Sequence, residues 1–566
     1  MRSKYGSRFI RTKTYRRSVA AYRWLETSQP KAVGWFRFPT TGVILLIASF
    51  WIFALVWSLA QTPYYRSRWE IGSPPLALRT GLLALGCFPF ILAFGAKWNI
   101  VGFVVGLSHK KLQVYHQWLS HLFLVLSLLH AFPFVVQGTN TVRTNADGLN
   151  PHGYSELYFA WRVKHMVYYW SGIAALVPLA WLCWSFLLGR RNRFYQLFKF
   201  LHIISAILFC TFFYIHCNNL LTSWSYLYAT AGVYLSSVVL RFGVMLYRNG
   251  RHVCTGSVEA LADNAVRVTV QLPQNSPHRW TAGQHFFLNF VKVLPFASQP
   301  LMVSNAPLSE DGHTTSKNPL TFVFHVNPAH GLGDRLLRLA ASSNPSTPVL
   351  LDGPYGGLVN RDLGRHDTVV LIAGGAGMSF VAAVLEDLVG RVVRKDPKVS
   401  GVKRIEVHWA VKNEDAKSWF DSQLTAAIKD VLDRPDFLSL NLYITGARAT
   451  SELTLSSSTL VGEEAKEEKL ELEGTVSVTS DGGVSRSSAS LPWTTHSSRP
   501  PISSLLSSLL SSAPFGSSIG IASCGPPSLV TDVRRAVAQR QAAIALGRTG
   551  GEGVGEVELH TEEMDW

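Results

Sequence analysis

The chain alternates long apolar runs with short basic segments over its first 250 residues, and then changes to shorter apolar runs separated by polar residues. Each of the six long runs is close to the roughly 20 residues that an α-helix needs to cross a bilayer. We predict membrane spans at 42–60, 79–96, 112–136, 165–187, 197–217 and 224–247. No signal-peptide-like apolar segment precedes them, so we expect the first span to act as the anchor.

After Arg251 the pattern is that of a water-soluble α/β protein. Alternation at 266–270 and a short apolar run at 286–290 predict strands of a small β-barrel. Continuous apolar runs at 368–373, 405–411, 438–444 and 519–524 predict buried parallel strands.

A segment at 451–515 interrupts this α/β pattern with acidic and serine-rich sequence. Its low hydrophobicity predicts a disordered insert. The leucine pairs at 505–506 and 509–510 repeat at four-residue spacing and would form a short amphipathic helix, too short to span a membrane.

The formal net charge of +16 arises mainly from basic clusters at 2–17, 110–111, 190–193 and 248–251, which flank apolar runs. Placing the N-terminus in the cytosol puts all of them on the cytosolic side, as the positive-inside rule requires. We therefore expect both termini in the cytosol and no binding to nucleic acid. The six cysteines show no metal-ligand spacing and indicate no disulfide framework.

Two of the predicted spans each carry two histidines fourteen positions apart. The pairs are His116 with His130 and His202 with His216. A step of fourteen returns to within roughly 40° of the same helix face and rises roughly 21 Å. Facing imidazoles in a helical bundle suit axial ligation of haem iron. A single membrane histidine is more often a hydrogen-bond donor, so the matched spacing carries the prediction.

The spans' directions decide which histidines would share a haem. Both helices run outward from the cytosol, so His116 would pair with His202 in an inner haem site and His130 with His216 in an outer one. By contrast, His121 lies about 140° around the helix from His116 and is a poor candidate for a ligand.

A buried strand at 368–373 leads into the glycine turn GGAG at 374–377 and then a helical pattern. Glycines let a backbone approach a phosphate, and the free N–H groups of a helix N-terminus face the anion. The turn therefore suits a dinucleotide, although a tight connection between strand and helix has the same sequence pattern.

Several motifs in order resemble the fungal ferric/cupric reductases of the ferric reductase and NADPH oxidase superfamily, from about residue 80 onward. The stretches are WTAGQH at 280–285, LDGPYG at 351–356, AGGAGM at 373–378, CGPP at 524–527 and the ending EEMDW at 562–566. The resemblance implies a six-span di-haem membrane bundle followed by a cytosolic module like ferredoxin-NADP reductase, with a β-barrel FAD domain and an α/β nucleotide domain.

The implied domains are a cytosolic basic arm at 1–41, a di-haem membrane domain at 42–248, an FAD-binding barrel at 252–360 and an NADPH-binding domain at 366–450 and 516–566, interrupted by the insert at 451–515. The implied cofactors are FAD, NADPH and two b-type haems. Flavin contacts carried over from the motifs are Gly283, Gln284, His285, Gln299, Pro300, Leu301, Ser304, Gly331, Gly353 and Pro354.

Contacts to the dinucleotide implied by the resemblance are Gly374, Gly375, Gly377, Met378, Lys412, Cys524, Gly525 and Pro526. In this family pattern Lys412 would meet the 2′-phosphate, Cys524 the nicotinamide, and Trp566 would cover the flavin ring. From the residues alone, Cys524 is equally compatible with a buried packing role, and Trp566 with a frayed end.

The sequence departs from the family pattern at two flavin motifs. It reads QPLM at 299–302, where the family has His-Pro-Phe followed by Thr or Ser, and GLG at 331–333, where it has Gly-x-Thr. The hydroxyl expected at Met302 is missing. Flavin affinity is the property that these changes put in question.

The expected activity is transfer of electrons from cytosolic NADPH through FAD and two haems to ferric chelates or cupric ion outside the cytosol, in support of iron or copper uptake. The resemblance allows an iron permease/oxidase system as partner. Two alternatives stay open: a superoxide-generating NADPH oxidase, and a flavin-defective haem-binding partner protein. The oxidases typically have a histidine where this chain has Phe134. The plasma membrane is the expected location, with the vacuole or another internal membrane as the alternative.

Overall fold

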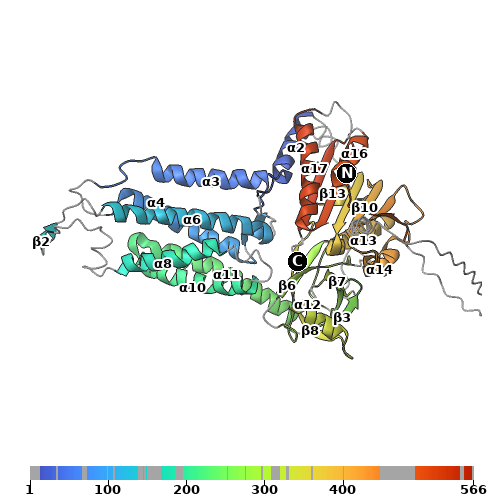
Figure 1. Cartoon of the computed structure of the whole chain (residues 1–566), viewed down its shortest axis with the longest axis horizontal. Coiled ribbons are helices and arrows are strands. Elements are labelled where there is room, and N and C mark those ends of the chain that lie inside the picture. The colour runs from blue at the N-terminus through green and yellow to red at the C-terminus, as the bar shows by residue number, and fades with distance from the viewer. Residues whose placement is uncertain are drawn as a thin grey trace, which may run out of the picture. The chain divides into compact units, whose positions relative to one another are not determined.

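The chain folds into two compact units in a computed structural model (Figure 1). One unit combines residues 1–31 with 247–566, and the other comprises residues 32–246. The structure describes residues 13–563 except 34–35, 67–72, 99, 106–108, 138–143, 146–147, 150–166, 186–194, 251–252, 274–275, 295–297, 308–318, 327–330, 359–360, 400, 447–490, 515 and 549–553.

A helix is present at each of the six positions where an apolar run predicts a span. All six lie in the unit 32–246, except that the last one continues beyond residue 246. They are α3 (Thr41–Leu59), α4 (Pro75–Gly95), α6 (His109–Gln137), α8 (Val167–Trp184), α10 (Tyr195–Cys217) and α11 (Ser223–Asn249). Within the described residues, five are long and apolar enough to cross a membrane, and α8 contributes the shorter apolar stretch Tyr169–Trp184. Short elements join them, namely α5 (Ile100–Val105), β1 (Thr144–Asn145), β2 (Gly148–Leu149) and η2 (Leu220–Thr222).

The helices of this unit pack as pairs, α4 on α6 and α8 on α10 (Figure 1). Leu122, Phe123 and Leu126 of α6 are almost completely buried between them. In contrast, Phe53 and Trp57 of α3 are exposed, at 56% and 63%. An apolar exterior around an apolar interior is expected for helices surrounded by lipid, where helix contacts come from close packing.

The second unit begins with an antiparallel sheet in the order β6-β5-β8-β3-β4-β7. Its strands are β3 (Cys254–Leu261), β4 (Ala265–Gln271), β5 (Gln284–Phe290), β6 (Ser298–Met302), β7 (Leu320–His325) and β8 (Ser346–Gly356), with α12 (Leu332–Ala340) before β8. Both strands predicted here from the sequence are present. The alternate residues Phe286, Leu288 and Phe290 are fully buried, which puts one face of β5 in the core and leaves the other for contacts.

A parallel sheet follows, in the order β12-β11-β10-β9-β13-β14. Its strands are β9 (Thr368–Gly374), β10 (Arg404–Val411), β11 (Leu438–Ile444), β12 (Trp493–His496), β13 (Ser518–Gly525) and β14 (Glu556–Glu563). Helices α13 (Met378–Val393), α14 (Asp421–Ile428), α16 (Ile502–Ser512) and α17 (Pro527–Ala545), with the short η3 (Leu363–Arg365), η4 (Gly375–Gly377) and η5 (Glu414–Trp419), connect the strands. The strand order reverses between β9 and β13, and ligands of open α/β sheets bind at such a switch point.

The end of the predicted insert is folded, which corrects its expected boundary. The short strand β12 extends the parallel sheet beside β11, and α16 packs on the sheet through Ile502, Leu506 and Leu510. These three residues recur at every fourth position and form one buried face. Serine dilutes the apolar content of this segment, so composition alone predicts disorder where tertiary packing gives a helix. The rest of the insert, 451–490, lies outside the described residues.

The basic arm contains a helix, α2 (Lys13–Thr27), that packs on α17 and β14. β14 is the edge strand of the parallel sheet, so its outward carbonyls have no partner strand. Arginine side chains donate to three alternate carbonyls along it: Arg16 to Gly555, Arg23 to Val557, and Arg361 to Leu559. The hydroxyl of Thr27 donates to Oε1 of Gln541 on α17 at 2.6 Å.

Candidate functional site

The structure brings the four membrane histidines together as the two predicted pairs. The ring centres of His116 and His202 lie 6.4 Å apart, and those of His130 and His216 lie 5.9 Å apart. Both pairs join α6 to α10, so the fourteen-residue spacing in each helix produces two levels of facing imidazoles.

These separations fit two imidazoles that share one iron. A histidine nitrogen binds a metal at about 2.0–2.1 Å, and with roughly 1.1 Å from nitrogen to ring centre on each side the two centres would lie about 6.2 Å apart. The observed 6.4 and 5.9 Å lie on either side of this value. The donor set therefore suits two bis-histidine haem sites.

Backbone carbonyls of α4 orient both α6 histidines. Nδ1 of His116 donates to the carbonyl of Ile91 at 2.9 Å, and Nδ1 of His130 donates to that of Ala77 at 2.8 Å. A carbonyl accepts only from a protonated nitrogen, so in each ring Nε2 carries the lone pair that a metal requires.

An aromatic layer separates the two histidine pairs. Phe123 of α6 is midway between the histidines of its helix, and its ring lies 5.8 Å from that of Phe209 and 5.7 Å from that of Phe213, both on α10. Phe88 of α4 completes the layer, 6.1 Å from Phe123. The layer is apolar and mostly buried, so it separates the two levels by a region of low dielectric.

Other histidines of α6 have different environments. His121 is half-buried, and its Nδ1 donates to the carbonyl of Gln117, in its own helix, at 2.6 Å. Nδ1 of His109 is 3.2 Å from the carbonyl of Ala96. The position four residues after His130 is Phe134, whose ring packs edge-on against the imidazole at 5.5 Å.

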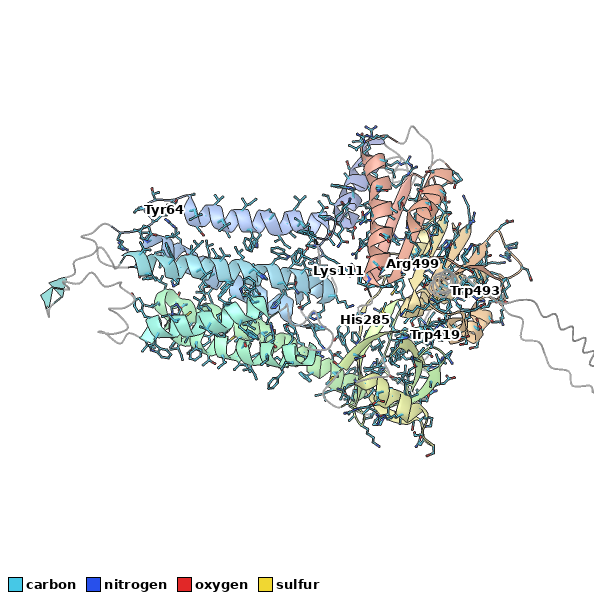
Figure 2. All side chains as sticks on the ribbon, viewed as in Figure 1. Tyr64, Lys111, His285, Trp419, Trp493 and Arg499 are labelled. Carbon is cyan, nitrogen blue, oxygen red and sulfur yellow. The ribbon has the colours of Figure 1, made fainter. Side chains whose placement is uncertain are left out.

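The exposed face of the antiparallel sheet presents three half-buried aromatic rings, those of His285 (labelled in Figure 2), Phe287 and Tyr355. The ring of Tyr355 lies 6.1 Å from that of His285 and 5.6 Å from that of Phe287. They come from β5 and β8, and Pro300 of β6 is the neighbour of Phe287 across the ladder. These aromatic rings suit contact with a flavin.

Two predicted flavin contacts point elsewhere. Leu301 is 4% exposed and belongs to the core of the antiparallel sheet. Ser304 is completely buried, and its hydroxyl donates to the carbonyl of Thr321 at 2.9 Å. Neither side chain shares the surface of His285, so the structure leaves only their backbone for contact with a flavin. Gln299 is exposed, opposite Leu288.

The remaining predicted flavin residues form turns close to β5. Gln284 stabilises its own turn, because its Oε1 accepts from the backbone N–H of Thr281 at 2.8 Å. Gly353, followed by Pro354, packs against Phe286, where a side chain would collide. Gly331 has a positive φ of 78° at the start of α12 and open space around it. An open glycine at a helix N-terminus suits a phosphate group.

The two predicted dinucleotide motifs lie against each other at the switch point. β9 and β13 are parallel neighbours, with Ala373 opposite Cys524. A Cβ on Gly377 would lie 2.2 Å from the carbonyl oxygen of Cys524, so only glycine allows this backbone contact. Gly374 is similarly close to Pro526 and Gly525, and Met378 begins α13. The Cys524 side chain itself is completely buried.

Gly375 is the open side of this loop. Its φ is +54°, and nothing lies within 4 Å of the position that a Cβ would take. The indole N–H of the buried Trp409 on β10 donates to its carbonyl at 2.9 Å. This hydrogen bond fixes the carbonyl of Gly375, while the position of a Cβ on the glycine is open. A loop that binds pyrophosphate needs this arrangement.

Lys412 follows β10 at the carboxyl edge of the sheet, and its side chain is exposed. Its carbonyl accepts from the N–H of Gly446 at 3.0 Å, which fixes its backbone. The backbone of Lys412 is therefore fixed, and its exposed ammonium group lies at the edge of the sheet where the dinucleotide motifs lie.

The two sheets contact each other through fixed hydrogen bonds. Gln423 donates to the carbonyl of Ser304 at 2.6 Å, and Trp419 donates to that of Ala262 at 2.9 Å (Figure 2). Glu386 of α13 accepts from the N–H of Ala306 at 3.1 Å, and burial raises the pKa of this carboxyl.

Two family models match parts of the chain. The family described as "Ferric reductase like transmembrane component" matches residues 80–213, and the family "Ferric reductase NAD binding domain" matches residues 366–538. "Probable cell surface ferric reductase kap2" of Aspergillus oryzae is 30% identical over 72% of this chain. The chain belongs to the ferric reductase family.

Further relatives carry similar names. "Ferric/cupric reductase transmembrane component 7" of Saccharomyces cerevisiae is 28% identical over 68% of this chain, and "Ferric/cupric reductase transmembrane component 1" of Candida albicans is 22% identical over 94%. The chain spans 53%, 58% and 63% of the lengths of the three relatives.

The structure also adds residues to this ferric reductase family member that sequence patterns do not reveal. His560 of β14 stacks on Phe380 of α13 at 5.7 Å, and Phe380 contacts Gly283 of the antiparallel sheet. Glu562 reaches Gly356 beside His285, so β14 ends next to the aromatic face. The sequence gives no signal for His560, Phe380 or Glu562. It does give one for Trp409, which is a large aromatic residue in a predicted buried strand. Trp566 lies outside the described residues.

Proposed function

We propose that this protein is a transmembrane metalloreductase that moves electrons from NADPH through FAD and two b-type haems to a ferric chelate or cupric ion on the opposite side of the membrane. The observation that carries the proposal is the pair of stacked imidazole levels, at separations that fit two irons, in the same chain as a dinucleotide-binding loop. Membership of the ferric reductase family supports the metal acceptor.

The way in which the chain divides between the two compact units favours six membrane spans. Residues 1–31 and 247–566 share one compact unit, so the segment between them leaves and returns to the same side of the membrane. An even number of crossings is needed. Five long helices with α8 make six, and the basic flanks put the shared unit in the cytosol.

When bound, FAD would accept a hydride from NADPH and haem iron would carry single electrons onward. The chain's own part is binding and orientation. The loop with Gly375 and Gly377 would hold the pyrophosphate, and the rings of His285, Phe287 and Tyr355 would support the flavin face. His116 with His202 would hold the inner haem, and His130 with His216 the outer one.

The oxidase alternative is disfavoured by the surroundings of His130. Phe134 packs against this imidazole, so an apolar ring occupies the position where the oxidases typically have a histidine. The flavin-defective alternative rests on Leu301, Met302 and Ser304, whose side chains are buried and offer no hydroxyl to a flavin.

Membranes containing the protein, supplied with NADPH, separate the three functions. We expect haem reduction, and formation of a ferrous-dye complex that persists without oxygen and resists superoxide dismutase. Superoxide as the main product would identify an oxidase. Haems that dithionite reduces but NADPH does not would identify a flavin-defective protein.

Lys412 is expected to select NADPH over NADH. Its exposed ammonium lies at the sheet edge where a 2′-phosphate would pass, and a hydrogen bond to a charged group contributes about 1.5–3 kcal/mol. Lys412→Ala should therefore raise KM for NADPH about 10–100-fold and leave KM for NADH unchanged. The control is Lys429→Ala, an exposed lysine after α14. Equal losses with both nucleotides would assign the lysine a different role.

The plasma membrane is the proposed location. The name of the Aspergillus relative describes a cell-surface protein, and the reduction of external metal requires the outer haem to face the exterior.

A further inference from the structure

Helix α4 carries the same short arrangement twice, once against each histidine of α6. Nδ1 of His130 donates to the carbonyl of Ala77, and four residues later a Cβ on Gly81 would lie 2.7 Å from that same Nδ1. At the other level His116 donates to Ile91, and a Cβ on Gly95 would lie 3.2 Å from Nδ1 of His116.

Helix geometry explains why a glycine follows each carbonyl by four. The carbonyl at position i already accepts from the N–H at i+4, and its second lone pair is open to another donor. The Cβ at i+4 tilts toward the helix N-terminus, over that oxygen. Removing it lets an imidazole approach the carbonyl from the side.

The two copies are in register with the histidines. Ala77 and Ile91 are fourteen residues apart, as are Gly81 and Gly95, and as are His116 and His130. Equal spacing on two packed antiparallel helices repeats the same contact at both levels. Close helix packing alone does not require this, since Gly86 of the same helix has nothing within 4 Å of its Cβ position.

We propose that Gly81 and Gly95 are ligand-positioning residues, each of which uncovers the carbonyl that sets the tautomer and ring plane of one haem ligand. The inference rests on the proposed di-haem function and deepens it. Donation from Nδ1 to a carbonyl increases the basicity of the metal-binding nitrogen, so each glycine also tunes the potential of its own haem.

The second ligand of each level is held differently. Gly172 of α8 lies against His216, where a Cβ would be 2.8 Å from Nδ1. By contrast, Nδ1 of His202 is buried and has no hydrogen-bond partner among the described residues. The inner level therefore has one ligand fixed by a carbonyl and one without this constraint, which makes Gly95 the main determinant of ring orientation there.

Single alanine substitutions test the proposal, with Gly86→Ala as the matched control on the same helix. Purified holoprotein would be analysed for haem per chain and for the spectrum and midpoint potential of each haem. Gly81→Ala should alter only the outer haem and Gly95→Ala only the inner one, with about 10–100-fold weaker retention of the affected haem. Gly86→Ala should match the wild type.

Several outcomes would overturn the proposal. If Gly81→Ala and Gly95→Ala match Gly86→Ala in haem content, spectra and potentials, the glycines do not position the ligands, although the di-haem function stands. A wild-type protein without haem would overturn both. If a variant does not assemble, hyperfine spectroscopy of the wild type decides: Nδ1 protons on the α6 ligands should be hydrogen-bonded and slow to exchange with deuterium, and rapid exchange contradicts the inference.

Discussion

His130→Ala should reduce ferric-chelate reduction at least about 100-fold while NADPH still reduces the flavin at the wild-type rate; a 100-fold loss corresponds to about 2.7 kcal/mol in the barrier. The imidazole faces that of His216 with ring centres 5.9 Å apart, and its loss would remove one of the two residues that we propose to hold the outer haem. The inner pair is unchanged. Haem content should fall from two toward one per chain, measured by pyridine haemochrome, and stopped-flow absorbance should show electrons stopping at the inner haem.

The control for this substitution is His121→Ala. His121 is on the same helix, but its ring donates to the carbonyl of Gln117 within that helix and does not face a histidine of α10. We expect both haems and full activity. An undiminished haem content in His130→Ala would contradict the assignment of the outer ligand.

Gly377→Ala should have the second large effect, the loss of NADPH oxidation by roughly 100-fold or more. A Cβ at this position would lie 2.2 Å from the carbonyl oxygen of Cys524, so β13 and the loop would have to separate. Because both are backbone, no side-chain rotation relieves the clash. NADPH-driven flavin reduction should fail in stopped-flow experiments, while dithionite still reduces the haems.

Gly401→Ala is the matched control, since nothing lies within 4 Å of its Cβ position. It should oxidise NADPH normally and retain the wild-type unfolding temperature. Normal nucleotide kinetics in Gly377→Ala would show that the dinucleotide does not bind at this loop.

The sequence predicts those features whose signal is periodic and local. The fourteen-residue spacing of the histidines fixes which rings meet, because a helix turns by a constant angle. The parallel strands follow from continuous apolar runs, whereas the switch point between β9 and β13 is known only from the structure. Gly374 and Cys524 are far apart in the chain, yet motifs at the carboxyl ends of parallel strands converge in space.

Features that depend on non-local packing are missed. β12 is short, and only its pairing with β11 identifies it as a strand. The leucine pairs predict the helix α16, but not its packing on the sheet. The flavin-facing set differs from the motif because side chains alternate across a strand, so the pairing of β6 with β5 turns Leu301 inward beside Phe286. Gly81 and Gly95 are silent in one sequence, since their partners belong to another helix.

The arginine contacts between α2 and β14 can form only late in synthesis. Residues 13–27 leave the ribosome before the helices α3 to α11, whereas α17 and β14, which they cover, are translated after all of these helices. Helix α2 therefore has no surface to pack on until more than 500 further residues have been made and the membrane helices have been translated. Closing such a long-range contact is slow and comes late. The unit that contains both sheets can therefore be completed only after β14 has been translated.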